Sequence, residues 1–169
     1  MTHVKTEEQP VYKHTVSPDR ADETGDDYHI RIALNILIKR QRVVGFMVGA
    51  PEDTHNFLKL KLSEKEHEVF AVLFLDTRHR LIKYVEMFKG TIGQSAVYPR
   101  EVAKEALKHN AAAVILAHNH PSGSPEPSAA DERITLRLRE ALAYFDVTVI
   151  DHMIVGQSEI VSLANRGVL

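Results

Sequence analysis

The chain has 169 residues, of which 44% are hydrophobic and 26% charged, and its formal net charge is −2 at pH 7. These values are typical of a globular protein with a buried core, and no apolar run approaches the ~20 residues that span a bilayer. The chain contains no cysteine, which excludes disulfides, thiolate metal sites and thiol nucleophiles. Its N-terminal residues lack the apolar segment of a secretory signal, so we expect a cytoplasmic location.

The first third of the chain is predicted to be an acidic tail followed by helices. Residues 1–27 are polar and acidic and include two prolines, which favours a disordered or loosely packed tail. Apolar residues at helical spacing predict a helix over residues 27–40. A second helix is expected from Pro51, a residue suited to the first helical turn, to about Leu62. We therefore expect a helical extension over residues 28–62 and a main domain over residues 63–169.

The rest of the chain alternates strands and helices. Two apolar segments, residues 69–75 and 81–88, flank the polar turn 76–79 and predict a hairpin. The later segments are predicted as a helix over 99–109, a strand over 112–118, a loop over 119–127, a helix over 128–145 and strands over 147–155 and 159–163. The residues of the long helix expected to face the core are Ile134, Leu138, Ala141 and Leu142. Helices interleaved with the strands of one sheet indicate an α/β or α+β architecture.

Two histidines end the predicted strand 112–118. His118 and His120 are two residues apart, so on an extended chain both rings leave the same face, with their α-carbons roughly 6–7 Å apart. Two imidazole nitrogens at that spacing can bind one zinc ion. The alternative is a pair of polar residues at a strand end, because this short pattern alone is a weak signal.

Asp131 is the natural third ligand. Ser128 has the position of a helix N-cap, and Asp131 then stands at the third helical residue, close to the strand end. Two neutral histidines and one carboxylate leave a fourth zinc position open for water, as in catalytic zinc sites. The alternative is that Ser128 and Asp131 form a capping box and nothing more.

Glu86 is the unusual residue of the second hairpin strand. It is expected to share a face with Ile82, Tyr84 and Phe88, while Leu81, Val85 and Met87 line the other face. A carboxylate buried without a partner costs several kcal/mol, and a nearby metal ion would remove this cost. With a water between itself and the ion, Glu86 would act as a general base. The alternative is an edge position from which Glu86 reaches solvent.

Several motifs together carry a family resemblance over about residues 30–169. Glu86, His118-x-His120, Ser128 and Asp131 resemble the JAMM signature of the MPN+ metallopeptidases. The surrounding sequence resembles the bacterial RadC family even more specifically. The matching segments are residues 88–91, 98–102, 110–113 and 117–123 and the pair Asp151-His152.

The resemblance implies a fold, a cofactor and a set of roles. It implies an MPN fold, in which helices flank a mixed β-sheet on a scaffold akin to that of cytidine deaminase. It implies one Zn²⁺ per chain at His118, His120 and Asp131, with Glu86 activating water and Ser128 stabilising the oxyanion. Longer family members carry a helix-hairpin-helix segment that binds DNA. Residues 1–60 lack its glycine-bearing hairpins, so we expect no direct DNA binding by this segment.

Three functions remain open from the sequence. The first is a zinc hydrolase that cleaves a peptide, isopeptide or other amide bond, with a protein or peptide as substrate. The second is a zinc-dependent nuclease or a factor associated with DNA repair. The third is a non-catalytic MPN scaffold or binding module, and an oligomer is possible in each case. The pair Asp151-His152 either orients a ligand histidine or places a hydrogen-bonded histidine in the core.

Overall fold

The computed structural model describes residues 25–42, 51–90 and 97–169, and most of the expected tail lies outside these ranges. The helices are α1 (Gly25–Arg42), α2 (Pro51–Leu62), α3 (Pro99–Lys108) and α4 (Ala129–Ala143). The strands are β1 (Val69–Leu75), β2 (Leu81–Lys89), β3 (Ala113–Asn119), β4 (Thr148–Val155) and β5 (Ile160–Ser162). The predicted order of helices and strands is confirmed, and α1 begins at Gly25, two residues before the predicted start.

One mixed sheet organises the described residues. Its five strands lie in the order β2-β1-β3-β4-β5. β1 runs antiparallel to both β2 and β3, β3 and β4 are parallel, and β5 returns antiparallel to β4. Because β1 and β3 are both central, all seven residues of each are buried and neither sequence alternates in polarity. The α/β class is thereby confirmed.

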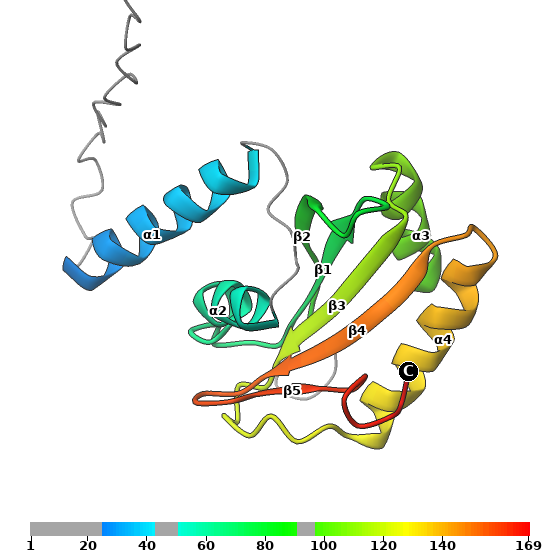
Figure 1. Ribbon diagram of the computed structural model, residues 1–169. Helices are drawn as coiled ribbons and strands as arrows, with labels where there is room; N and C mark the ends of the chain where they lie inside the picture. The colour runs from blue at the N-terminus through cyan, green and yellow to red at the C-terminus, as the bar shows by residue number, and fades with distance from the viewer. Residues whose placement is uncertain (1–24, 43–50, 91–96) are drawn as a thin grey trace, which may run out of the picture.

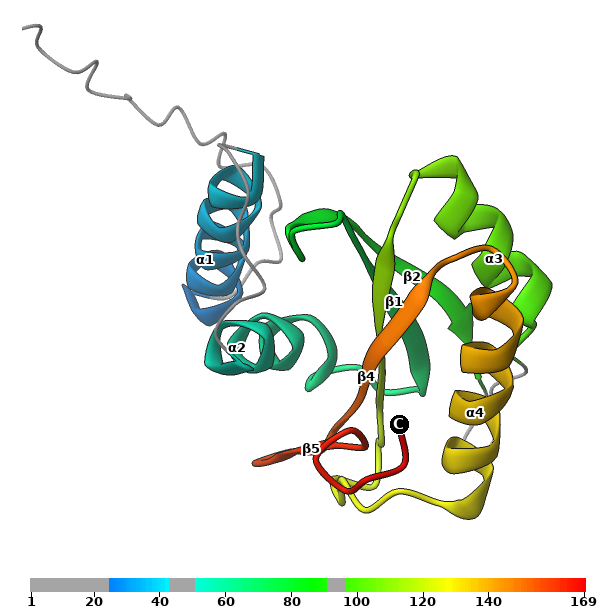
Figure 2. The ribbon, with the colours of Figure 1, turned by 45° about the vertical axis from the view of Figure 1, so that its right-hand side comes forward.

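Helices cover both faces of this sheet. α2 lies against one face, and α3 and α4 lie side by side against the other (Figures 1 and 2). The α2 face holds a core of Phe57, Leu58 and Leu62 with the odd-numbered residues of β1. The opposite face joins Phe70, Val72 and Phe74 to apolar residues of α3 and α4. The division into an extension and a main domain stays a prediction, and α2 shares its core with the sheet.

The helix starts follow local rules. Pro99 occupies the first turn of α3, where its missing N–H removes no helical hydrogen bond. Ser128 caps α4: its Oγ accepts from the Asp131 backbone N–H, and the Asp131 carboxylate accepts from the Ser128 N–H. The predicted N-cap of the long helix is therefore confirmed. The predicted core face of α4 needs one change, because Thr135 is fully buried whereas Ile134 and Ala141 are half-buried.

Two β-bulges change which side chains of β2 share a face. Phe70 pairs with Phe88 but Ala71 pairs with Glu86, so Met87 is an extra residue, and a second irregularity lies between Phe74 and Leu75. One extra residue reverses the alternation of the strand. As a result Phe88 packs on the α3–α4 face, while Leu81 and Tyr84 pack on the α2 face. The predicted grouping of Glu86 with Phe88, and of Leu81 with Val85, is therefore wrong.

Within the described ranges, no helix combines the length and the apolar character that crossing a membrane requires.

Candidate metal centre

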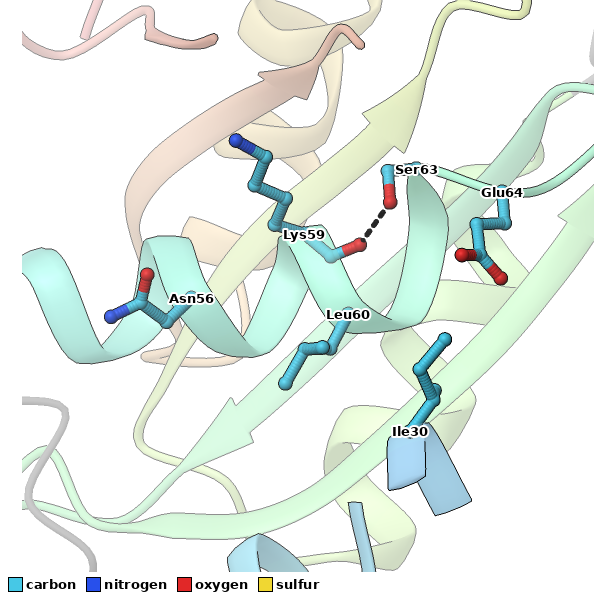
Figure 3. A pocket seen from close by; sticks show the side chains of 6 residues that line it. All are labelled: Ile30, Asn56, Lys59, Leu60, Ser63 and Glu64. Carbon is cyan, nitrogen blue, oxygen red and sulfur yellow. Dashed lines mark hydrogen bonds between the residues drawn. The ribbon is translucent and has the colours of Figure 1, made fainter. Parts of the chain in front are cut away.

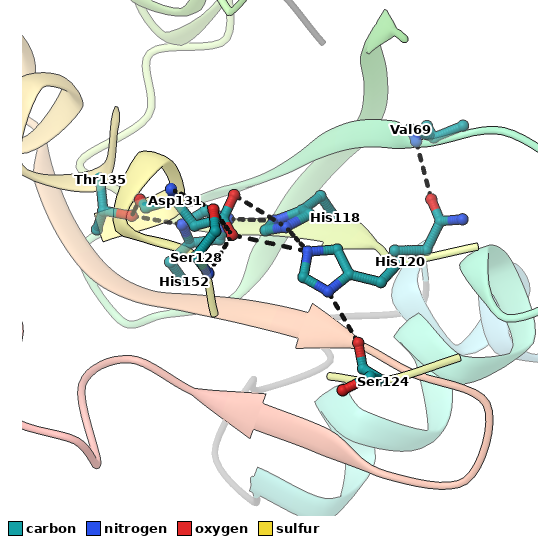
Figure 4. A network of polar contacts seen from close by, with 9 residues as sticks. Val69, His118, His120, Ser124, Ser128, Asp131, Thr135 and His152 are labelled. Atoms are coloured by element: carbon teal, nitrogen blue, oxygen red, sulfur yellow. Dashed lines mark hydrogen bonds and ion pairs between the residues drawn. The ribbon is translucent and has the colours of Figure 1, made fainter. Parts of the chain in front are cut away.

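Three of the predicted side chains meet at the carboxyl end of β3. His118, His120 and Asp131 each offer one ligand atom, and these atoms lie within 4.8 Å of one another. The two Nε2 atoms of the histidines are 2.9 Å apart. Asp131 Oδ1 is 3.3 Å from His118 Nε2, and Asp131 Oδ2 is 3.7 Å from His120 Nε2. Figure 4 shows both rings directed at the carboxylate from the start of α4.

The sheet fixes the direction of the histidines. His118 pairs with Phe70 across β1 and β3, and their rings stack at 6.3 Å with an interplanar angle of 10°. The His118 ring is buried, while His120, one step beyond the strand, is partly exposed. The alternation of β3 therefore sends both rings to the α4 face, whereas Asn119 points to the α2 face.

Both histidines present a lone pair to the group. His120 Nδ1 donates to the Ser124 carbonyl oxygen at 2.8 Å, so Nε2 of a neutral ring carries no proton. His118 uses Nδ1 for His152 Nε2 at 2.8 Å and turns its own Nε2 toward Asp131. Two imidazole nitrogens and a carboxylate oxygen are ligands that zinc prefers. Two nitrogen atoms this close need a proton or a metal ion between them, and together with the Asp131 carboxylate they fit a metal ion.

The electrostatics match this arrangement. Burial lowers the pKa of His118 to about 4, and Asp131 opposes this shift. The Asp131 carboxylate raises the pKa of the more exposed His120. Burial disfavours ionisation of Asp131, but its interactions with His120, Ser128 and His118 hold its pKa well below the usual range. Asp131 is thus a carboxylate and His118 a neutral ring at neutral pH, the protonation states in which both can bind a metal.

Ser128 lies beside the group. Its hydroxyl donates to Asp131 Oδ2 at 2.6 Å, and its backbone N–H donates to the same oxygen at 2.7 Å. These two bonds leave Oδ1 facing His118. The capping box and the metal ligand, which the sequence offered as alternatives for Asp131, are therefore compatible because they use different oxygens.

The structure does not bring Glu86 to this group. Glu86 pairs with Ala71, which lines the α2 face, and its carboxylate contacts Lys65 Nζ at 3.2 Å and the Tyr84 hydroxyl at 3.4 Å. His118 lies two strands away on the opposite face. The expectation that Glu86 faces the vacant coordination position is therefore corrected. There are two physical reasons: β1 separates β2 from β3, and the bulge at Met87 places Glu86 opposite Ala71 on the α2 face.

Glu68 is the carboxylate that the structure places near the group. Phe70 pairs with His118, and continuing this antiparallel register by two residues sets Glu68 opposite His120 on the same face. Burial and the negative charge of Asp131 raise the pKa of Glu68, while the nearby His120 lowers it. The sequence signal was weak, since Glu68 reads as the last polar residue before a buried strand. The position of Glu68 becomes informative only through the pairing of β1 with β3.

Asn119 fixes the segment that carries Glu68. Its side-chain oxygen accepts from the Val69 backbone N–H at 2.8 Å, and its amide donates to the carbonyl oxygens of His67 and Lys65 at 3.1 and 3.3 Å. Its side chain is buried, so these bonds are not exchanged with water. Asn119 thus ties the chain on both sides of Glu68 to the end of β3.

The loop between His120 and Ser128 is held by contacts with residues that follow β4. Gln157 N–H donates to the Gly123 carbonyl, and a Cβ added at Gly156 would lie 2.6 Å from that oxygen, so only glycine fits there. Arg166 forms a bidentate ion pair with Glu126 at 2.6 and 2.8 Å. These contacts connect the loop to the C-terminal segment and hold Ser124, the acceptor of His120.

A separate hollow lies between α1 and α2. Its lining residues are Ile30, Asn56, Lys59, Leu60, Ser63 and Glu64 (Figure 3). It is on the α2 side of the sheet, and none of these residues belongs to the metal-ligand group. The chemistry described above therefore does not take place in this hollow.

Comparison with known proteins places the chain in a family. Residues 48–168 match the model of the RadC-like JAB domain. A UPF0758 protein of Vibrio cholerae is 49% identical over 159 residues, covering 94% of this chain and 91% of the relative. A UPF0758 protein of Marinobacter nauticus is 58% identical over 125 residues, but the match covers 74% of this chain and 56% of that relative. The chain thus spans about half the length of some relatives. It belongs to the RadC-like JAB domain family.

Proposed function

We propose that this chain is a zinc-dependent hydrolase that cleaves a peptide, isopeptide or other amide bond. The observation that carries the proposal is the convergence of two histidine nitrogens and one carboxylate oxygen within 4.8 Å. This ligand set is the one used by catalytic zinc sites that keep one position open. His118, His120 and Asp131 would hold the single ion.

Glu68 takes the role of general base in this proposal. A bound zinc ion would acidify water and polarise the carbonyl of the substrate. Glu68 lies across from His120, and its raised pKa suits a group that accepts a proton from the attacking water and passes it to the leaving amine. Glu86 does not fit this role, because its carboxylate pairs with Lys65 on the other face.

Ser128 is proposed to bind the oxyanion. Its hydroxyl now donates to Asp131 Oδ2, and the Ser128 backbone N–H also donates to this oxygen. The hydroxyl can therefore turn to the substrate while the backbone bond continues to hold the carboxylate. A donor aimed at the developing negative charge contributes strongly to catalysis of acyl transfer.

The substrate, the cellular location and the partners of this chain are further parts of the proposal. The substrate is proposed to be a protein or peptide, and the location to be cytoplasmic. Direct DNA binding by this chain is not expected. The ligand group of the described residues suits one metal ion, whereas many phosphodiesterases use two ions ~3.5–4 Å apart, which favours amide over phosphodiester cleavage.

Metal content and cleavage products test the proposal together. The full chain is purified without chelator, and zinc per chain is measured by mass spectrometry. Wild type and Glu68→Gln are then incubated with a library of peptides from a bacterial proteome, and new N-termini are identified. Supercoiled plasmid is the parallel probe for nicking. Glu86→Gln is the matched control, because it makes the same change on the other face.

The expected result is one zinc per chain, new N-termini with wild type and Glu86→Gln, and none with Glu68→Gln. Zinc-dependent nicking without peptide cleavage would favour the nuclease. Failure to take up zinc would favour a scaffold.

A further inference from the structure

A chain of three hydrogen bonds, two of them fully buried, runs behind the ligand group. His118 Nδ1 contacts His152 Nε2 at 2.8 Å, His152 Nδ1 contacts Thr135 Oγ1, and Thr135 Oγ1 donates to the Asp131 carbonyl oxygen at 2.6 Å. These residues come from β3, β4 and α4. This chain of hydrogen bonds therefore starts at one proposed ligand, His118, and ends at the backbone of another, Asp131 (Figure 4).

The donor and the acceptor of each hydrogen bond in this chain can be assigned. A carbonyl oxygen can only accept, so the single hydroxyl proton of Thr135 is used on Asp131. Thr135 Oγ1 must then accept from His152 Nδ1. A neutral His152 has no second proton, so its Nε2 accepts, and His118 Nδ1 is the donor. The Nε2 atom of His118 is left as a lone pair directed at Asp131.

Burial makes this order of donors costly to change. His152 and Thr135 are both 0% exposed and His118 is 1% exposed, so water cannot replace a lost partner. A positive charge on His152 is opposed by the same burial. Phe70 packs against both rings, with centroids 6.3 Å from His118 and 5.4 Å from His152, which restrains their rotation.

We infer that His152 and Thr135 are positioning residues that fix His118 in the tautomer able to bind metal through Nε2. The same chain of hydrogen bonds joins β4 and the first turn of α4 to the ligand group, so that His118 and Asp131 are oriented together. The inference rests on the proposed metal centre. It adds that the ligand state of His118 is set before any ion arrives.

The first measurement uses the metal-free full chain. Long-range ¹H–¹⁵N NMR spectra of the histidine rings report which nitrogen of His118 carries the proton. We expect the Nδ1–H tautomer in wild type. A predominantly Nε2–H ring in the metal-free wild type would overturn the inference.

The second measurement is zinc affinity, by competition with a chelator. His152→Phe removes the acceptor and should weaken zinc binding roughly 10–100-fold, the usual cost of losing a partner of a ligand histidine. His152→Gln can retain an acceptor for His118 and should bind more tightly than His152→Phe. Thermal unfolding of each metal-free variant controls for folding.

The Thr135 pair keeps the test decisive if His152→Phe fails to fold. Thr135→Val keeps the shape and removes the hydroxyl, whereas Thr135→Ser keeps it. We expect weaker zinc binding for Thr135→Val, with affinity restored in Thr135→Ser. Equal affinity in wild type, Thr135→Val and Thr135→Ser would overturn the inference. A wild type that takes up no zinc would instead refute the proposed function, while the NMR measurement on metal-free protein would still decide this inference.

Discussion

Glu68, the residue before β1, and Glu86 of the neighbouring strand β2 face opposite sides of one sheet. Glu86 is balanced by Lys65 at 3.2 Å, and Lys61 lies nearby with its amino group 5.5 Å from the centre of the Tyr84 ring. Glu68 faces His120 and Asp131, and its carboxylate forms no hydrogen bond or ion pair with the residues that the structure describes. The two carboxylates therefore have opposite electrostatic surroundings.

The contrast teaches how a carboxylate in a sheet can be assigned a role. A partly buried carboxylate beside a lysine already has its counter-charge, and such an ion pair contributes at most about 1 kcal/mol to stability. A partly buried carboxylate beside another carboxylate is strained electrostatically until a cation or a proton arrives. Residue type and strand position do not distinguish the two, whereas the face does.

The largest expected difference between the two faces is in turnover. Glu68→Gln should lower peptide hydrolysis about 10²–10⁴-fold, the usual contribution of a general base. Glu86→Gln should change it only a few-fold, because the residue is remote from the group. Both variants should retain zinc. Equal losses in the two variants would remove the distinction between the faces.

The next largest effect is on zinc retention. His120→Ala and Asp131→Asn each remove a proposed ligand, and the loss of affinity should exceed the roughly 10–100-fold caused by losing a partner behind a ligand. Lys65→Met, on the α2 face, should bind zinc as wild type does. Chelator competition measures all three. A zinc affinity in Asp131→Asn equal to that of wild type would exclude this carboxylate as a ligand.

A smaller effect is expected from pH. Asp131 raises the pKa of His120 in the metal-free protein, so a proton competes with zinc at this ring. Affinity should therefore be highest above the raised pKa of His120 and fall as the pH is lowered through it. His118 should add to this fall only near its pKa of about 4. Calorimetry in buffers of different ionisation enthalpy would count the released protons, and a pH-independent affinity would argue against His120.

The smallest effect belongs to the α2 face. Tyr84 donates to Glu86 at 3.4 Å, and both burial and Glu86 raise the pKa of Tyr84. Tyr84→Phe should lower the free energy of unfolding by at most about 1 kcal/mol, because the bond is long and partly exposed. Denaturant unfolding measures this change. Zinc affinity should not change, and a marked loss would show that the two faces are coupled.

Local patterns were enough to predict the α/β class and four side chains in or beside the centre. Ser128 and Asp131 follow from the rules of helix capping, and His118 and His120 follow from strand alternation, so each depends on residues close in sequence. Glu68 depends on the pairing of β1 with β3, which links residues about fifty positions apart. Thr135 likewise becomes meaningful only when β4 places His152 beside it.

The wrong prediction for the direction of the Glu86 side chain has a more specific cause. The bulge that inserts Met87 carries no clear signal in the sequence Tyr84 to Phe88, because the segment contains no glycine or proline and its residues other than Glu86 suit a regular strand. One unpaired residue was enough to move the carboxylate to the other face. Alternation is therefore a reliable guide along β3, where the ladder with β1 is regular, and an unreliable one along β2.

The most direct measurement is a crystal structure of the zinc-loaded full chain with anomalous data at the zinc edge. We expect one peak per chain, ~2.0–2.2 Å from His118 Nε2, His120 Nε2 and a carboxylate oxygen of Asp131, with Glu68 facing the open position and Glu86 still paired with Lys65. A peak bound by other residues, or Glu86 at the ion in place of Glu68, would contradict it.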